Sequence, residues 1–534
     1  MESHLRLPTI IAMLTIQTAL LAIVNIFLRT RLVLLTRLHL AIWPSCRWDE
    51  KKHEADVDEK LRLLLPRESF SHGQAFLERV EMTLRTPLST SSLLMLSHRL
   101  KAQYLERIQD PICMLPSFNH QLPTGDERGR FLALDLGGST LRVALVELTG
   151  SSLEVHDKCQ ILSQKSFPIT SPVKALRGMP FFHWLAERIE ETLVGQYLPE
   201  PSLPMGVSWS FPIEQTSHQS GRLLQMGKGF LAAEGLLRQD LGQLIESCCH
   251  QRGLNVRLHA IINDSSATLL STAYLAPATR FALILGTGVN AAVHLPVGLF
   301  GAAKFGIRPS EWFASAQHVI VNTEMSMMGH DILPTSKWDD SLRAHHPNPD
   351  FQPLETLVSG GHLGEIIRLI LVDAIESAGF FGGIVPPSLR EKYSLSTETI
   401  SQVEQNHSTQ LSTARHLFSE RHPTTNPPSD QDLEALHLIA SHVIYRASCL
   451  VAAGIHALWH FRNEVEGISA PQFSHTIVAY NGSVIENYPG FRAACQVHLD
   501  LLVQASGGNA GMVELAHARE SSLIGAAIAC AVST

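Results

Sequence analysis

Long apolar stretches and shorter alternating ones divide the chain into different kinds of segment. No charged residue interrupts residues 7–28, and most of them are Leu, Ile, Ala or Val. Residues 49–60 are polar and are predicted to form a solvated linker. From 57 to 109 apolar residues recur at helical spacing, as Leu61, Leu64 and Leu65 do. Helices are therefore predicted after the linker.

Two stretches share a pattern of strand, glycine turn and strand. The first joins residues 130–136 to 141–148 around Gly137-Gly138-Ser139, and the second joins 281–285 to 290–295 around Gly286-Thr287-Gly288. Further strands are predicted at 203–211, 256–262 and 475–479, and helices at 181–194, 236–249, 436–459 and 521–532. Residues 397–432 are polar and contain prolines, so helix and surface loop are expected there. Two similar hairpins, each followed by helices, predict two α/β domains with a cleft between them.

The N-terminal apolar run is long enough to cross a membrane, because about 20 residues at about 1.5 Å each span the hydrocarbon layer. Arg6 precedes the run, and Arg29, Arg31 and Arg37 follow it. This charge distribution predicts that the bulk of the chain faces the cytosol. Three other interpretations remain open: a cleaved signal peptide, a mitochondrial presequence and a buried core helix. We expect residues 1–45 to be a membrane anchor and 46–60 a linker.

Composition narrows the class of protein. The chain has 534 residues, of which 45% are hydrophobic and 17% charged, and its net charge is −8 at pH 7. No long basic run is present, so no nucleic-acid partner is expected. The eight cysteines are scattered without a C-x-x-C pair, which favours reduced thiols in the cytosol over a disulfide framework or a zinc site. Glycosylation sequons at Asn263 and Asn481 lie on predicted site loops, where a glycan would block the site, so secretion is not expected.

The candidate chemistry lies at the ends of predicted strands. Glycine-rich turns can present backbone N–H groups to phosphate oxygens, although a tight β-turn explains each of the two turns equally well. Asn263-Asp264 follows the apolar segment 258–262. A carboxylate at a strand end in an α/β sheet lies at the cleft, where a general base is needed. The alternative is that Asp264 only caps a helix.

Taken in order, several segments resemble the eukaryotic hexokinases from about Leu61 to Ala531. The segments that carry the resemblance are 115–125, 131–138, 210–212, 228–230, 263–264, 285–288, 322–324, Glu355 and 364–369. The resemblance implies the two-domain hexokinase fold, built from actin-like, ribonuclease H-like ATPase domains. It also implies a division into 61–129 as the helical start of the large domain, 130–264 as the small domain, 265–519 as the rest of the large domain, and 520–534 as a helix returning to the small domain.

The implied activity is ATP-dependent phosphorylation of a hexose at its 6-hydroxyl. Asp264 would be the general base, with Lys228 near the transferred phosphoryl group. The hexose would bind to Ser210, Lys228, Asn263, Asn290, Glu324 and Glu355. The nucleotide would bind to Asp135, Gly137, Gly138, Ser139, Arg142, Gly286, Thr287, Gly288, Gly482 and Ser483. No protein group would bind metal directly, because Mg²⁺ would arrive with ATP and meet Asp135 through water. The partners would be the hexose, Mg-ATP and a membrane, and we expect that membrane to be the mitochondrial outer membrane.

The chain departs from the family pattern mainly on the nucleotide side. This chain has Thr140 where the family has an Asn, Gly227 where it has a sugar-binding Thr, and Asn481 where it has an Asp. It also has Ser521-Ser522-Leu523 where the family has a Gly-Ser-Gly turn. Losing one neutral hydrogen bond costs about 0.5–1.5 kcal/mol, so each change alone is tolerable. Leu523 would cost about 1–2 kcal/mol if it needed a left-handed backbone, and it would crowd the adenine. Two hypotheses follow: a hexose kinase, and a sugar-responsive regulator with weak or no turnover.

Overall fold

Two mixed β-sheets organise the described residues, and they share one strand order apart from the additional edge strand β1 of the larger sheet. A computed structural model describes residues 72–150, 158–196, 202–227, 229–407, 411–424 and 427–533. The five-stranded sheet has the order β4-β3-β2-β5-β8, and the six-stranded sheet the order β1-β11-β10-β9-β12-β13. In each, an antiparallel hairpin (β2–β3 or β9–β10) continues into two parallel strands. The predicted pair of similar hairpins is confirmed.

The five-stranded sheet and its helices are called the small lobe here. Its strands are β2 (Arg128–Leu136), β3 (Thr140–Thr149), β4 (Cys159–Pro168), β5 (Leu203–Trp209) and β8 (Val256–Ile262). Helices α6 (Met179–Leu193) and α7 (Leu241–Gln251) pack on it, and α5 (Ser171–Lys174) and the hairpin β6 (Ile213–Gln215) to β7 (Gly221–Leu223) complete it. The sequence pattern did not predict β4.

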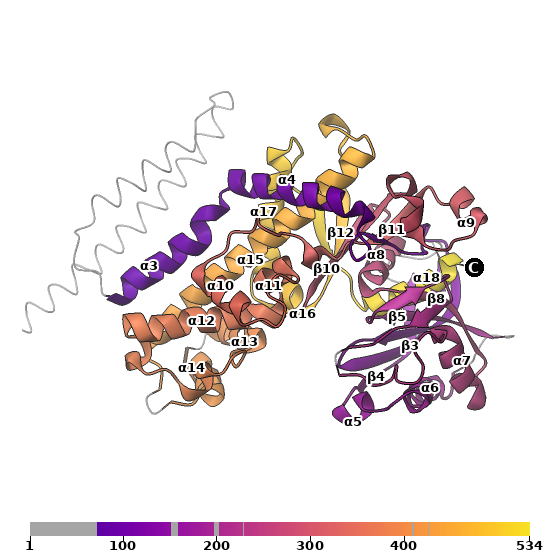
Figure 1. Ribbon diagram of the computed structural model, residues 1–534, viewed down its shortest axis with the longest axis horizontal. Coiled ribbons are helices and arrows are strands. Elements are labelled where there is room, and N and C mark those ends of the chain that lie inside the picture. Colours follow the sequence, from indigo (N-terminus) through magenta and orange to yellow (C-terminus); the bar gives the residue numbers. More distant parts are fainter. Residues whose placement is uncertain are drawn as a thin grey trace, which may run out of the picture. The chain divides into compact units, whose positions relative to one another are not determined.

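The six-stranded sheet and its helices are called the large lobe. Its strands are β1 (Leu115–Pro116), β9 (Thr279–Leu285), β10 (Val289–Pro296), β11 (His318–Asn322), β12 (Thr476–Asn481) and β13 (Val513–His517). The helices are α3 (His72–Arg85), α4 (Thr90–Glu106), α9 (Ser310–Ser315), α10 (Lys337–Ala344), α11 (Pro353–Val358), α12 (Gly360–Ala378), α13 (Thr397–His407), α14 (Leu411–Arg421), α15 (Asp430–Val465), α16 (Ser483–Asn487) and α17 (Phe491–Ala505). Figure 1 shows both lobes and the helices that cover their sheets.

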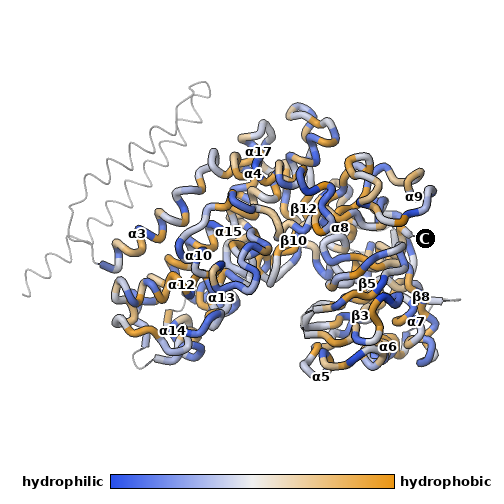
Figure 2. Tube along the Cα trace, in the orientation of Figure 1, coloured by the Kyte–Doolittle hydropathy of each residue, from blue (hydrophilic) through white to orange (hydrophobic). Residues whose placement is uncertain are grey.

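Local signals explain where the helices begin and which side they bury. Ser429 and Asp432 form a capping box that starts α15 several residues before the predicted 436. Helix α3 buries Phe76, Val80 and Leu84 at the spacing of one helical face. Figure 2 shows orange and blue positions following one another along α3 and α4, as expected of helices that bury one side.

Helix α15 passes the length and hydropathy test for a membrane span. It has 36 residues with a window of mean hydropathy 1.6, but 83% of that window is buried inside the fold. It is the central helix of the large lobe, where α17, α4 and α3 pack around it. The predicted anchor at 1–45 and the linker at 46–60 lie outside the described residues.

Helices α8 (Asp264–Leu275) and α18 (Ser521–Ser533) lie where the two lobes meet. They pack against each other, and α18 also contacts β2, β5 and β8. A Cβ on Gly525 would lie 2.1 Å from the carbonyl oxygen of Ala267, so only glycine permits this approach. Their apolar cluster includes Ala133 of the small sheet and Ala282 of the large sheet. The two helices therefore form the apolar layer that the lobes share.

Candidate active site

One pocket is lined by residues from both lobes. It has a volume of about 380 Å³. The residues that line it are Gly137, Gly138, Ser210, Asn263, Asp264, Ile284, Gly286, Thr287, Gly288, Val289, Asn290, Glu324, Ser326, Gln352 and Glu355. Most of the residues predicted for sugar and phosphate binding are therefore brought together, although they lie far apart in the sequence.

Sheet topology explains the meeting of the small-lobe residues. Strands β2, β5 and β8 are parallel neighbours, so their carboxyl ends share one edge of the sheet. Gly137, Ser210 and Asn263 each follow one of these strands directly. In the large lobe, β9 and β12 are also parallel neighbours, and Gly286 and Gly482 each follow one of them directly.

Asn263, rather than Asp264, caps helix α8. The Asn263 side chain accepts hydrogen bonds from the Ser265 backbone N–H at 2.9 Å and from the Ser265 hydroxyl at 2.7 Å. Asp264 is the first residue of the helix and lines the pocket, and its Oδ1 also accepts the Ser265 backbone N–H at 2.7 Å. The N-cap explanation considered for Asp264 is thus wrong, because the residue before it has that role. A carboxylate in the first turn is also favoured by the helix dipole.

A chain of amide side chains positions Glu324. Asn290 donates to the Oδ1 of Asn322 at 2.8 Å, and Asn322 donates to the Oε1 of Glu324 at 2.7 Å. Glu324 has a left-handed backbone with a φ of 52°. Such a conformation is costly for a residue with a side chain, and it is typical of functional sites.

Glu355 is held against the glycine turn after β9. Its Oε2 accepts the backbone N–H of Val289 at 2.9 Å, and a Cβ on Gly288 would lie 2.7 Å from that oxygen. Glycine at 288 therefore makes room for the carboxylate. Burial raises the pKa of Glu324, the Asn322 hydrogen bond lowers it by less, and the negative charges of Asp264 and Glu355 raise it further.

The turn at 286–288 lies against the first turn of helix α12. Gly360 and Gly361 donate their backbone N–H groups to the carbonyls of Gly286 and Thr287 at 2.8 and 3.0 Å. A Cβ on Gly286 would lie 3.3 Å from the backbone nitrogen of Ser483, and one on Gly482 would lie 2.4 Å from the carbonyl of Leu285. Gly482 and Ser483 therefore lie beside the turn, although they do not line the pocket.

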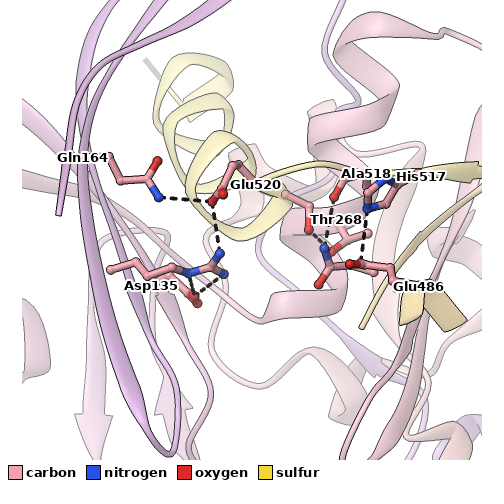
Figure 3. A network of polar contacts seen from close by, with 10 residues as sticks. Asp135, Gln164, Thr268, Glu486, His517, Ala518 and Glu520 are labelled. Carbon is pink, nitrogen blue, oxygen red and sulfur yellow. Dashed lines mark hydrogen bonds and ion pairs between the residues drawn. The ribbon is translucent and has the colours of Figure 1, made fainter. Parts of the chain in front are cut away.

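Asp135 and Arg142 form an ion pair behind the first glycine turn. The Nη2 of Arg142 lies 2.7 Å from Asp135, and its Nη1 lies 3.1 Å from Glu520. Burial lowers the pKa of Arg142, but the hydrogen-bonded charge of Asp135 and the charges of Glu520 and Glu486 outweigh it and raise that pKa. Figure 3 shows Glu520 between this pair and Gln164. Asp135, Ser139 and Arg142 lie at or next to this turn in the sequence and do not line the pocket.

The structure corrects the expectation that Leu523, at the C-terminal departure from the family pattern, could need a left-handed backbone. Leu523 is helical and fully buried in the apolar layer of α8 and α18, and the residue with left-handed φ is Glu520, at 46°. Leu523 therefore carries no left-handed strain. The hydroxyl of Ser521 lies 2.9 Å from that of Thr268, so it joins the two helices. Asn481 donates to the carbonyl of Ala518 at 3.1 Å.

One predicted residue is not described by the structure, and four pocket residues were not predicted. Lys228 lies outside the described residues, and its predicted role is untested. Ile284, Val289, Ser326 and Gln352 line the pocket and were not predicted. The sequence signals for the last two are a polar residue two positions after Glu324 and another directly before the segment that contains Glu355.

The residues that the structure describes contain neither a candidate metal cluster nor a disulfide. There, no group of three or more His, Cys, Asp or Glu residues could hold a metal ion. The cysteines of the same residues are free thiols. Cys46 lies outside them.

Comparison with known proteins identifies the family. Two models described as hexokinase match residues 79–274 and 280–532. N-acetylglucosamine kinase 1 of Candida albicans is 30% identical over 447 residues, 79% of this chain and 86% of the relative. Hexokinase-1 of Arabidopsis thaliana is 30% identical over 430 residues, 78% of this chain and 82% of the relative. A solved hexokinase of Schistosoma mansoni, complexed with glucose, superposes with a TM-score of 0.70 at 26% identity, covering 86% of this chain and 99% of that one. With two lobes of the same topology, a pocket between them and matches to both family models, the chain belongs to the hexokinase family of sugar kinases.

Proposed function

We propose that this protein transfers the γ-phosphoryl group of Mg-ATP to the 6-hydroxyl of a hexose. The observation that carries the proposal is the pocket itself. It unites Asp264 at the start of α8, the acceptor groups Glu324 and Glu355, and the glycine turns at 137–138 and 286–288. Phosphoryl transfer needs a carboxylate near the alcohol and backbone donors near the phosphates.

Each side chain has a defined task in the proposed reaction. Glu324, Glu355, Asn290, Asn263 and Ser210 bind hydroxyl groups and orient the hexose. Carboxylates and amides suit this task, because each hexose hydroxyl can donate and accept. Asp264 takes the proton of the 6-hydroxyl as that oxygen bonds to the transferred phosphorus, while the bond from phosphorus to the oxygen of ADP breaks.

The nucleotide is assigned to the glycine turns. A Cβ on Gly288 would meet Glu355 and one on Gly482 would meet Leu285, so glycine at these positions lets the turns pack closely. Bound Mg-ATP would supply the phosphoryl group and the charge of the metal. Gly137, Gly138 and Gly286–Gly288 would hold the phosphates, with Gly482 and Ser483 beside them. Asp135 and Arg142 brace the first turn, and Asp135 would reach the metal through water.

A coupled assay tests the proposal. Glucose, mannose and fructose are each supplied with Mg-ATP, and ADP release is followed together with identification of the phosphorylated carbon. We expect hexose-dependent ADP release and a 6-phosphate product. Binding of hexose without turnover would favour the regulator hypothesis. The absence of both binding and turnover would overturn both hypotheses.

The identity of the hexose is a separate question. Among the relatives reported above, one is named for N-acetylglucosamine and one as a hexokinase. N-acetylglucosamine therefore belongs in the same assay as a second candidate substrate.

A further inference from the structure

Glu486 and His517 form a polar pair beside Gly482, and no role assigned above uses it. Glu486 lies in α16, and His517 is the last residue of β13. The Nε2 of His517 lies 3.3 Å from the Oε1 of Glu486, and Figure 3 shows this contact as a dashed line between the two side chains. The exposed fractions of the two side chains are 37% and 25%, so the attraction between their charges is weak by itself.

The same oxygen of Glu486 also holds the backbone of Gly482. Its Oε1 accepts the Gly482 N–H at 2.9 Å. Gly482 has a φ of 126°, a conformation that glycine adopts readily and other residues adopt rarely. A backbone with that much freedom needs an external contact to fix the orientation of its peptide group. Glu486 supplies the contact from the last turn of the short helix that Gly482 begins.

Two neighbouring strands fix the position of His517. His517 is paired with Tyr480 in the ladder of β12 and β13, and the two rings stack with their centroids 5.3 Å apart. Ala518 donates its backbone N–H to the carbonyl of Tyr480 at 2.9 Å, and Asn481 donates its side-chain N–H to the carbonyl of Ala518 at 3.1 Å. The imidazole therefore has a defined place, from which it orients the carboxylate of Glu486.

Gly482 packs directly on the first half of the turn at 286–288. A Cβ on Gly482 would lie 2.4 Å from the carbonyl oxygen of Leu285 and 2.8 Å from the backbone nitrogen of Gly286, which lines the pocket. These are backbone atoms, so a shift of Gly482 must move them. The far end of the turn is held separately, because the N–H of Val289 bonds to Glu355. The effect of Gly482 is thus confined to the start of the turn.

The charge of Glu486 distinguishes a positioning role from direct binding. A carboxylate repels phosphate oxygens, so Glu486 does not suit contact with a nucleotide. Neither Glu486 nor His517 lines the pocket. Glu486 instead binds the Gly482 N–H and His517, and its effect on a ligand must pass through the backbone of Gly482.

We propose that Glu486, oriented by His517, is a positioning residue for the nucleotide. It fixes Gly482 against Gly286 and thereby sets the affinity of the pocket-lining turn for Mg-ATP. The inference rests on the proposed kinase function, because it deepens the assignment of the turn at 286–288 to the nucleotide. The affinity for hexose should not depend on this pair.

The test measures kcat and the KM values for Mg-ATP and glucose in the full-length parent, Glu486→Ala, Glu486→Gln and His517→Leu. We expect Glu486→Ala to raise KM for Mg-ATP by about tenfold, which is the loss of about one hydrogen bond, and to leave KM for glucose unchanged. Glutamine keeps an oxygen that accepts the Gly482 N–H, so Glu486→Gln should bring KM for Mg-ATP back to within about twofold of the parent. His517→Leu removes only the weaker contact and should raise that KM by about two- to threefold.

Glu514→Ala is the matched control. Glu514 also lies in β13, and it forms a partly exposed pair with His475 at 3.0 Å. Among the described residues its side chain has no hydrogen bond with a glycine turn. The control should keep every kinetic constant of the parent. Melting temperatures of all variants should stay close to that of the parent, because each substituted side chain is partly exposed.

The outcomes separate the inference from the kinase proposal. An unchanged KM for Mg-ATP in Glu486→Ala, or an equal rise in Glu514→Ala, would overturn the inference and leave the kinase. A rise in both KM values, or one that glutamine does not reverse, would also overturn it. If the parent phosphorylates no hexose, the kinase proposal fails, and calorimetric titration with Mg-ATP decides the inference. Weaker binding in Glu486→Ala but not in Glu514→Ala would support it, whereas equal Kd values, or no binding to the parent, would refute it.

Discussion

At the scale of single residues, Asn263 and Asp264 occupy neighbouring positions at the start of α8 and on the wall of the pocket. The side chain of Asn263 accepts the backbone N–H and the hydroxyl of Ser265 at the start of α8. Asp264 then enters the helix one position later with its carboxylate on the pocket. Both side chains accept the Ser265 N–H, but of the two Asn263 is the N-cap and Asp264 is the first helical residue.

Replacing Asp264 by Ala should remove the proposed general base and one of the two acceptors of the Ser265 N–H, while leaving the Asn263 cap in place. We expect turnover to fall by about 10²–10⁴-fold, with hexose binding largely retained. Steady-state kinetics and a glucose thermal shift measure the two quantities. Asp350→Ala, an exposed carboxylate in the loop before α11, is the control and should match the parent. Parent-level turnover in Asp264→Ala would remove that residue from the mechanism.

The raised pKa of Glu324 gives a signed pH dependence. Burial and the charges of Asp264 and Glu355 raise this pKa above its ordinary value of 4.5, against the Asn322 hydrogen bond. Between 4.5 and the raised value the folded state holds more protons than the unfolded state. Glu324 therefore stabilises the fold fully below its unfolded pKa, and this contribution is lost as the pH rises through its folded pKa.

Glu324→Gln should remove that dependence. We expect the free energy of unfolding of the parent to fall, relative to that of the variant, as the pH rises from about 4.5. Urea unfolding of both proteins at several pH values measures it. Parallel curves for parent and variant would show that Glu324 keeps an ordinary pKa in the folded protein.

At the scale of elements, the packing of α18 on α8 and on β5 depends on the absence of side chains. A Cβ on Gly525 would lie 2.1 Å from the carbonyl oxygen of Ala267, and one on Gly206 would lie 2.1 Å from that of Ala526. Both obstacles are backbone atoms, which cannot rotate away. These glycines set the spacing of the layer between the lobes.

Gly525→Ala tests which effect dominates in that helix. Alanine is about 1 kcal/mol better than glycine in a helix interior, but the contact with Ala267 demands that α8 and α18 separate. We expect a net destabilisation of about 1–3 kcal/mol, typical of overpacking, measured by urea unfolding. Gly298→Ala is the control, because its added Cβ would meet no atom within 4 Å. A more stable Gly525→Ala protein would contradict the packing argument.

At the scale of the whole molecule, the pocket takes its two walls from different lobes. Ser210 lies on the small lobe, while Asn290, Glu324 and Glu355 lie on the large lobe. A hexose that contacts both walls binds the closed arrangement better than the open one, and it shifts the population by that difference in affinity.

Hexose alone should therefore stabilise and close the protein. At a hundredfold excess over Kd the stabilisation is about 2.7 kcal/mol, visible as a higher melting temperature, and small-angle scattering should give a smaller radius of gyration. ATP alone should do less, because the departures from the family lie mainly on the nucleotide side. Glu324→Ala combined with Glu355→Ala should abolish both effects. If millimolar hexose changes neither quantity in the parent, the sugar site does not function.

The predicted membrane anchor at 1–45 remains a proposal for the whole chain. The full chain should fractionate with membranes and resist carbonate extraction, because residues 7–28 carry no charge. A chain beginning near Asp49 should be soluble. Full-length protein recovered in solution without detergent would refute the anchor.

The sequence alone predicted the two hairpins and most of the larger strands and helices, together with the residues proposed for the site. Alternating apolar residues around Gly137 and Gly286 predicted both hairpins, and these appear as β2–β3 and β9–β10. The apolar segment before Asn263 predicted β8 and a carboxylate at its end. These features are local, because periodicity and turn residues act over a few positions. The order of the motifs along the chain carried the resemblance to the family.

Only the tertiary structure decided how those elements meet. No local pattern shows that Leu523 is a buried helical residue, that Asn263 takes the cap from Asp264, or that Glu355 lies over Gly288. The pairing of Ser326 with Gln352 joins two loops that are 26 positions apart. Such contacts depend on which strands lie side by side and on where backbone can approach backbone, and packing of the whole chain sets both.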